Sequence, residues 1–281
     1  MAAIALFQFE PYCSRDCGAG VLSALSGLHE ITIITRHDLS LDHLSHYNMV
    51  IFPGGRGDAN DFKHLLKSKR PILKAYLEQG GTYLGICMGA YWADQIYFDL
   101  IGETRCVQYI TRPKAEIRRS FPTVVRAEWQ GQSEKFYFYD GCTFIDSDPS
   151  IETYATYANG DPMAIITGNV GLIGCHLESE LGWYQSQTMR SAWHDLKHHR
   201  LLAEFVDCLL QRGQLHENNS ISASINMAPL GNATIEIENL RAALQEIERE
   251  TSMFTQGTFK KIHDIARRAL SATPRVRVKS D

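Results

Sequence analysis

The sequence predicts an α/β protein with a doubly wound, mainly parallel sheet, an added antiparallel β region and a C-terminal helical extension. Short apolar runs alternate with helix-compatible segments over the first hundred residues, which favours parallel strands joined by right-handed crossovers. Between residues 102 and 145 the pattern changes to alternating and aromatic segments separated by turn residues, which is typical of antiparallel hairpins.

The first half of the chain supplies the parallel strands and their helices. The apolar runs predict strands at residues 2–9, 31–36, 49–52 and 82–86. The segments between them predict helices at residues 19–28 and 41–47, a kinked helix or two helices at 59–79 with Pro71 as the break, and a helix after residue 87 that continues to about Asp99.

The second half supplies the antiparallel region and the closing helices. Strand patterns occupy residues 123–129, 135–144, 152–158 and 163–167, and an apolar strand from residue 170 ends at His176. Asp140 and Gly141 have the sequence of a hairpin turn, which we favour over a role at the border of the site. Residues 188–212 have helical spacing, and a polar helix face is the favoured interpretation of His194, His198 and His199 over a metal site.

The chain divides into three predicted parts. A domain spans residues 1–213, a polar linker rich in Asn and Ser spans 214–234, and a helical extension spans 235–281. The extension carries an apolar stripe on its first helix and basic residues on its second, so it could fold back, pair between subunits or bind a protein partner.

Composition argues against several classes of protein. A net charge of −4 over 281 residues provides no field for nucleic acid or an anionic membrane, and no apolar stretch approaches the length of a membrane span. Residues 1–13 lack the features of a signal peptide. Seven scattered cysteines, the closest being Cys13 and Cys17, predict reduced thiols in the cytoplasm.

Residues 80–95 carry the strongest chemical signal. An apolar run breaks at Gly85-Ile86-Cys87-Met88-Gly89 and resumes as a helical pattern, which is the G-x-nucleophile-x-G elbow with sulfur in place of hydroxyl. Such a turn projects the thiol above the carboxyl ends of the sheet, at a helix N-terminus that favours thiolate. The alternative is an inert buried cysteine between two packing glycines.

Two further stretches would complete a nucleophilic site. Gly54 and Gly55 follow a predicted strand, so their backbone N–H groups, with that of Met88, are candidates for an oxyanion hole, although Pro-Gly-Gly is also an ordinary turn. His176 and Glu178 lie two residues apart at a strand end. His176 could move the thiol proton and Glu178 could orient the ring, whereas an isolated His-x-Glu is more often a solvated strand end.

Residues 1 to about 200 resemble the biotin-protein ligase N-terminal domain family, within the class I glutamine amidotransferase-like superfamily. The motifs that carry the resemblance are FPGG at 52–55, GGTYLGICMGAYWA at 80–93, FYFYDG at 136–141 and CHLESE at 175–180. The resemblance implies a flavodoxin-like sheet and a Cys-His-Glu triad, with Cys87, His176 and Glu178 at the three positions.

One departure concerns the substrate. Glutaminases of the superfamily commonly follow the elbow with Gln or His, where this chain has Tyr91, which suits the ligase-associated branch and belongs with the predicted substrate-binding residues. No segment resembles a biotin ligase catalytic domain, so we do not expect the protein to attach biotin.

The leading hypothesis is a cysteine-dependent amide or acyl hydrolase, or an acyl transferase, that acts through a thioester on a small-molecule or peptide carboxamide. It requires no metal and no organic cofactor. A catalytically silent binding or regulatory module and a cysteine peptidase of the same superfamily remain open alternatives.

Overall fold

The computed structural model describes residues 1–8, 14–146, 150–193 and 195–227. Residues 1–218 form one compact unit, and residues 219–281 form a second. The predicted helical extension at 235–281 lies outside the described residues, as does Cys13.

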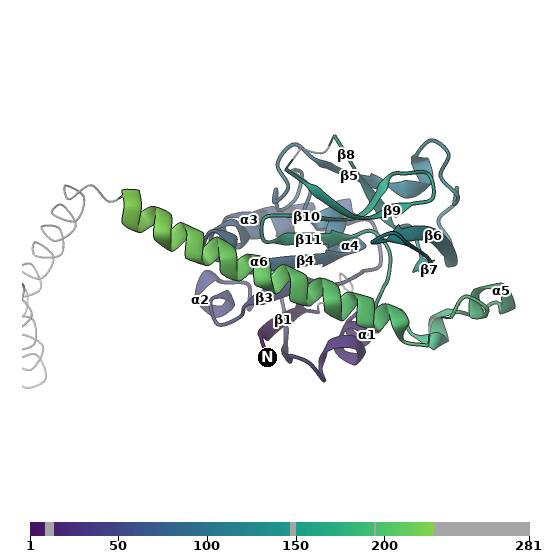
Figure 1. Cartoon of the computed structure of the whole chain (residues 1–281), viewed down its shortest axis with the longest axis horizontal. Helices are drawn as coiled ribbons and strands as arrows, with labels where there is room; N and C mark the ends of the chain where they lie inside the picture. The colour runs from purple at the N-terminus through teal and green to yellow at the C-terminus, as the bar shows by residue number, and fades with distance from the viewer. Residues whose placement is uncertain (9–13, 147–149, 194, 228–281) are drawn as a thin grey trace, which may run out of the picture. The chain divides into compact units, whose positions relative to one another are not determined.

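A nine-stranded mixed sheet runs through the first unit (Figure 1). Five neighbouring strands are parallel, and their order across the sheet is β2 (Glu30–Ile34), β1 (Ala3–Phe7), β3 (Met49–Phe52), β4 (Thr82–Ile86) and β11 (Val170–Ile173). The sheet continues antiparallel through β10 (Pro162–Thr167), β9 (Glu152–Tyr157), β6 (Thr123–Trp129) and β7 (Gln132–Phe138). This arrangement confirms the predicted fold class.

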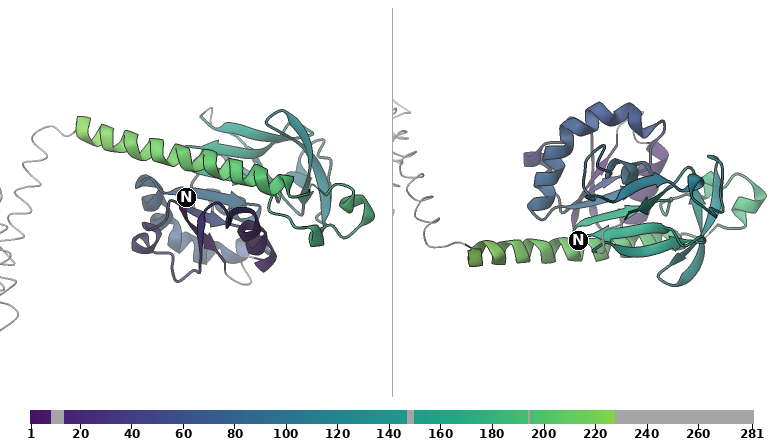
Figure 2. Two further views of the ribbon diagram at one scale, coloured as in Figure 1. Left: turned by 60° about the horizontal axis from the view of Figure 1, so that its bottom comes forward. Right: turned by 90° about the horizontal axis from the view of Figure 1, so that it is seen from above.

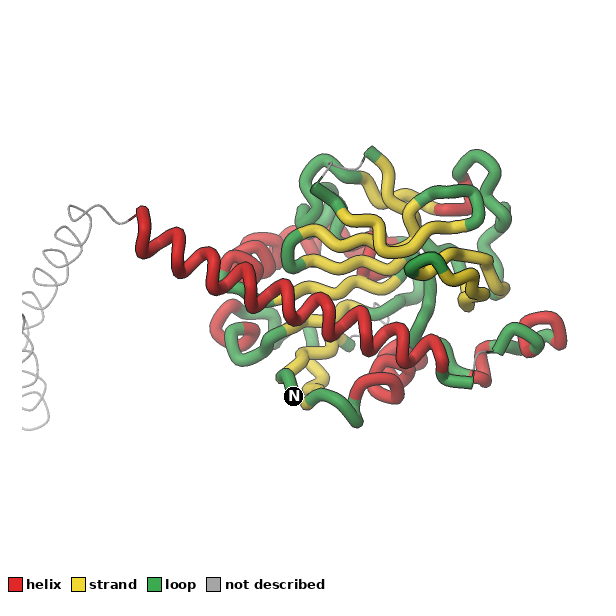
Figure 3. Tube along the Cα trace, in the orientation of Figure 1, coloured by secondary structure: helices red, strands yellow, loops and turns green. Residues whose placement is uncertain are grey.

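Helices cover both faces of the sheet (Figures 2 and 3). One core layer includes residues of α1 (Arg15–Leu25) and α6 (Lys197–Met227). The opposite layer includes residues of α2 (Leu41–Leu44), α3 (Lys63–Glu78) and α4 (Met88–Trp92). The central strands β3 and β4 are therefore buried on both faces, which is why they are continuous apolar runs.

Smaller elements complete the unit. A separate two-stranded antiparallel sheet pairs β5 (Arg105–Gln108) with β8 (Cys142–Ile145). Single turns of 3₁₀-helix occupy η1 (Ala59–Phe62), η2 (Tyr109–Thr111) and η3 (Leu181–Trp183), and α5 (Gln187–Arg190) is a short helix. The predicted antiparallel region between residues 102 and 145 is thus present.

Several predicted boundaries were wrong. The helix expected at 19–28 begins at Arg15 and ends at Leu25. Of the two alternatives for residues 59–79, the single helix is the one observed, since α3 contains Pro71 and follows η1. The helix after the elbow ends at Trp92 rather than near Asp99. In the segment that follows, the Asp94 carboxylate accepts a hydrogen bond from the backbone N–H of Cys106 at 2.8 Å. This contact joins residues twelve positions apart, so local hydrophobic periodicity could not predict it.

The closing helical segment also differs from the prediction. The single helix expected at 188–212 is divided into α5 and α6, and Asp195 and Leu196 between them have positive φ angles of 46° and 62°, which a continuous helix excludes. α6 then continues to Met227, so the predicted linker at 214–234 is helical over its first part. Within the described ranges, no helix combines the length and hydrophobicity that a membrane span needs.

Candidate active site

Cys87 lies in a strained turn between β4 and α4. Its φ of 50° and ψ of −103° are unusual for a residue with a side chain, and strain of this kind persists only where the surroundings enforce it. The Cys87 N–H donates to the Ile173 carbonyl of β11 at 2.8 Å, which fixes the turn. At Gly89 a Cβ atom would collide with the Phe52 carbonyl, so α4 can lie against β3 only with glycine there.

His176 and Glu178 form a buried hydrogen-bonded pair. The imidazole Nδ1 donates to Glu178 Oε1 at 2.8 Å, and the two residues are only 5% and 0% exposed. The strand was expected to reach His176, but β11 ends at Ile173. Beyond it His176 makes an isolated antiparallel bridge to Tyr137, whose carbonyl accepts the His176 N–H at 3.1 Å. A backbone bond from β7 therefore sets the position of the ring.

The charge state of His176 is set by opposing effects. Burial lowers the pKa of this imidazole, but Cys87, Glu178 and hydrogen bonds with the Cys17 and Cys87 thiols together raise it well above the usual histidine range. The Glu178 carboxylate stabilises the imidazolium form and fixes the tautomer, so that Nε2 remains available to exchange a proton with a cysteine thiol. This arrangement can accept a thiol proton and later return it to a leaving group.

Aromatic rings enclose the imidazole from two directions. The ring centroid of His176 lies 5.8 Å from that of Tyr137 and 5.6 Å from that of Trp183, both edge to face. Tyr137 and Trp183 also pack against each other at 5.1 Å. The sequence analysis gave neither aromatic residue a role, although Tyr137 belongs to the FYFYDG motif, because their place beside His176 comes from strand pairing and a 3₁₀ turn.

Gly54 lies directly beside the imidazole. A Cβ atom at this position would lie 2.7 Å from His176 Cε1 and 2.8 Å from Cys17 Sγ. The Gly54 carbonyl accepts the Ser14 N–H at 3.2 Å, which ties the start of α1 to the end of β3. The FPGG turn thus reaches His176 and Cys17, whereas the oxyanion role of the Gly54, Gly55 and Met88 N–H groups stays a prediction.

Tyr91 and the turn after β7 form another side of the site. The Tyr91 hydroxyl donates to the Asp140 carbonyl at 3.3 Å, and the Cys87 thiol lies 3.8 Å from the Tyr139 carbonyl. Burial raises the pKa of the Tyr91 phenol well above its usual range, so this group is a neutral donor. The hairpin turn that we favoured for Asp140 and Gly141 was wrong, because β7 pairs with β6 and β8 pairs with β5, so the bend at Asp140, with φ of 52°, joins strands of two different sheets. The same bend borders the Cys87 thiol.

Cys17 is a second thiol in the site, and the sequence analysis did not assign it a role there. It lies in the first turn of α1, is hydrogen-bonded to His176, and has its pKa raised chiefly by burial. Ligand atoms of Cys17, His176 and Glu178 all lie within 4.8 Å of one another. The sequence could have placed Cys17 near the site, because Cys17 follows β1, and the carboxyl end of this parallel strand lies at the same edge of the sheet as those of β3 and β4.

The histidines of the closing helix are buried rather than solvated. His198 and His199 are 1% and 5% exposed, which corrects the expected polar face, and His194 lies outside the described residues. His199 Nε2 is 3.1 Å from the Ser179 carbonyl. α6 therefore holds the segment that carries Glu178, which explains why these side chains point inward.

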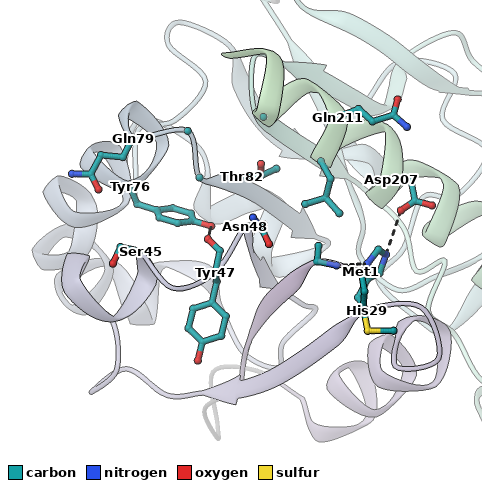
Figure 4. A pocket seen from close by; sticks show the side chains of 15 residues that line it. Met1, His29, Ser45, Tyr47, Asn48, Tyr76, Gln79, Thr82, Asp207 and Gln211 are labelled. Carbon is teal, nitrogen blue, oxygen red and sulfur yellow. Dashed lines mark hydrogen bonds and ion pairs between the residues drawn. The ribbon is translucent and has the colours of Figure 1, made fainter. Parts of the chain in front are cut away.

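A cavity of about 440 Å³ lies at the opposite edge of the sheet (Figure 4). Ala2, Asn48 and Thr82 line it at the amino ends of β1, β3 and β4, and no residue of the triad contributes. His29 and Asp207 form an ion pair of 3.4 Å at its side. Open parallel sheets bind ligands at the carboxyl ends of strands, so the Cys87 edge, and not this cavity, is the candidate active site.

The family comparison identifies the segment that contains the elbow. A family model described as "Biotin-protein ligase, N terminal" matches residues 11–108. The resemblance to this family is confirmed over that segment. The biotin-protein ligase N-terminal match includes Gly54 and Cys87 but stops before His176 and Glu178. No curated protein matches the chain.

Solved structures extend the likeness to most of the chain at the level of fold. A structure described as a glutamine amidotransferase has a TM-score of 0.53 and 18% identity, covering 74% of this chain and 98% of its own. PurLQS from Thermotoga maritima has a TM-score of 0.52 and 14% identity, covering 73% of this chain and 100% of its own. The protein thus has a glutamine amidotransferase-like fold.

Proposed function

We propose that the protein is a cysteine-dependent amide or acyl hydrolase, or an acyl transferase, with Cys87 as nucleophile, His176 as acid and base, and Glu178 as the residue that orients the imidazole. The observation that carries the proposal is the hydrogen-bonded His176–Glu178 pair beside a cysteine in a strained elbow. Strain and a perturbed imidazole at one sheet edge are features that functional sites commonly share.

The proposed reaction proceeds through a thioester. The Cys87 thiolate attacks the acyl carbon of a carboxamide, a C–S bond forms, and the C–N bond breaks as imidazolium of His176 gives its proton to the leaving amine. Water or an acceptor amine then attacks the thioester while His176 removes its proton, and the thiolate leaves. Gly55 and Met88 N–H groups are the candidates to stabilise the oxyanion.

Tyr91 and the aromatic pair favour a substrate with an apolar or aromatic group beside the carboxamide. Tyr91 follows the elbow, its hydroxyl is bonded to the Asp140 carbonyl, and Tyr137 and Trp183 line the imidazole.

The six described cysteines are free, which supports a reducing compartment such as the cytoplasm for this chemistry.

A thiol-directed acyl probe tests the assignment. We expect one modified site per chain, loss of labelling in Cys87→Ala, and labelling in His176→Ala slowed by about 10²-fold or more, because proton transfer by a positioned base contributes an effect of that order. Cys208→Ala is the matched control, since this half-buried thiol lies on α6 and should leave the rate unchanged. Unchanged labelling in both site variants would reject the proposal.

Intact-mass measurement after incubation with a pool of carboxamides, esters and peptides identifies the acyl group. A transient adduct on Cys87 that disappears with product supports the hydrolase or transferase. Cleaved peptides would instead identify a cysteine peptidase. A folded protein that forms no adduct and no product with any member would favour the binding or regulatory module.

A further inference from the structure

We infer that Cys17, His176 and Glu178 form a binding site for a single thiophilic divalent cation, with Zn²⁺ as the preferred ion. The three side chains come from separate elements, Cys17 from α1 and the other two from the segment after β11. This site goes beyond the proposed function, because the proposed reaction needs no metal and gives the Cys17 thiol no role.

The donor set matches zinc in both chemistry and distance. Thiolate, imidazole and carboxylate are its ordinary ligands, and three protein ligands with one open position are a common arrangement. Ideal bond lengths place neighbouring donors about 3.5 Å apart around a tetrahedral ion. The donor atoms here already lie within 4.8 Å of one another, so side-chain shifts of about 1 Å would close the site.

Glu178 supplies the independent observation that points to a cation. The side chain is fully buried, its Oε1 is bonded to His176, and its Oε2 has no hydrogen-bond partner among the residues that the structure describes. A buried carboxylate oxygen without a partner is costly, and coordination of a metal ion is one of the ways in which proteins satisfy it. Cys17 Sγ lies within 4.8 Å of the carboxylate.

The packing around the site holds the three donors close together. A Cβ at Gly54 would collide with both His176 Cε1 and Cys17 Sγ, and a Cβ at Gly20 would collide with the Glu178 carbonyl. α1 is therefore seated directly against the segment that carries His176 and Glu178. Thiol and carboxylate are brought together by helix packing, without any contribution from Cys87.

Metal binding and catalysis would compete for the same imidazole. A cation on Cys17, His176 and Glu178 displaces the Cys17 thiol proton and the proton on the ring nitrogen that it binds, and both protons pass to solvent. It thereby removes the ring nitrogen, or the contact with Glu178, on which the proton transfer of the proposed reaction relies. Under the proposed function, Zn²⁺ therefore inhibits the reaction of Cys87 while the nucleophile itself stays free. The inhibition rests on that function, but the binding does not.

Cobalt substitution measures binding without any turnover. Titration of the full chain with Co²⁺ should give a thiolate-to-cobalt charge-transfer band that saturates at one ion per chain and disappears when Zn²⁺ is added. We expect Cys17→Ser to lose the band, Cys87→Ser to retain it, and Cys208→Ser, a thiol on α6, to behave as wild type. Thermal unfolding of each variant establishes that it is folded.

The assignment has two ways to fail. A band that persists in folded Cys17→Ser, or one that is lost in Cys87→Ser and kept in Cys17→Ser, would overturn it. Inhibition is measured separately, as the rate of acyl labelling at Cys87 with and without Zn²⁺. We expect Zn²⁺ to slow labelling at least tenfold in the wild type and less than twofold in Cys17→Ser. If Cys87 is not labelled even without metal, the proposed function is rejected, whereas the cobalt titration still tests the metal site by itself.

Discussion

Gly54 shows how a residue without a side chain can determine where two reactive side chains lie. The imidazole of His176 and the thiol of Cys17 both lie within 3 Å of the place that a Cβ would occupy. At those distances at least one of the two must move, and core packing leaves few directions for it. The glycine is therefore required by the site and not only by the turn.

Gly54→Ala should lower the rate of acyl labelling at Cys87 by about tenfold or more, since small displacements of a catalytic group can cost up to about 10²-fold. Gly27→Ala is the matched control, because a Cβ there would meet nothing within 4 Å. The two variants are compared by labelling rate and by thermal midpoint. Equal labelling rates in the two would show that the imidazole tolerates the displacement.

Sequence reasoning recovered the residues of the site that belong to contiguous motifs. Cys87 is marked by its flanking glycines, and His176 and Glu178 by their spacing after an apolar run. Cys17, Tyr137 and Trp183 come to the imidazole through α1 packing, strand pairing and a 3₁₀ turn. The motif that contains Tyr137 and the place of Cys17 after β1 mark the edge of the sheet on which these residues lie, but their contacts with the imidazole are tertiary and were not predicted.

At the scale of elements, the buried strands were predicted more accurately than the helices. The limits of β3 and β4 coincide with the predicted runs at 49–52 and 82–86, because strands buried on both faces are mainly apolar and each run ends at a recognisable turn, Pro53-Gly54 after β3 and the Cys87 elbow after β4. The ends of α1, α4 and α6 depend on contacts elsewhere in the fold. Periodicity locates such helices but does not fix where they stop.

His198 on α6 should make the fold sensitive to acid. Burial, followed by the charges of Lys197 and His199, lowers the pKa of His198 to about 3. Glu134 Oε2 lies 3.6 Å from the ring, but Lys197 already pairs with that carboxylate, so it compensates little. The folded-state pKa lies below the unfolded value near 6.5, so this stabilisation is complete above that pH and is lost as the pH falls toward 3.

Urea unfolding measures this loss. Between pH 6.5 and 5 the wild-type free energy of unfolding should fall by about 2 kcal/mol more than that of His198→Gln, which cannot take up the proton. His46→Gln, at an exposed position, serves as the control and should follow the wild type. Parallel curves for the wild type and His198→Gln would contradict the burial argument.

At the scale of the molecule, the site belongs wholly to the first compact unit. Every residue assigned to the reaction lies within residues 1–218, and all of them lie at the carboxyl edge of the parallel strands. The predicted domain boundary at 213 is close to this division, but α6 continues through the first part of the predicted linker, and the extension at 235–281 stays a prediction. The chemistry should therefore not require the second unit.

A chain cut after Asn218 should fold and label Cys87 at a rate within twofold of the full-length protein. Its thermal midpoint should change little, because the buried core residues that α6 contributes all precede the cut, namely Leu202, Ala203, Phe205, Val206 and Leu209. Labelling and differential scanning calorimetry of both chains test this expectation. A tenfold slower reaction in a folded truncated chain would mean that residues 219–281 act on the site.

β11 joins the two halves of the sheet, because it pairs in parallel with β4 and antiparallel with β10. The sulfur is built on the parallel half, while the imidazole is positioned by a backbone bond from β7 in the antiparallel half. Selection can therefore vary these two reactive groups on separate scaffolds. Under the proposed function, insertions or exchanges among the hairpins would change the choice of substrate while the turn between β4 and α4 that carries Cys87 stays the same.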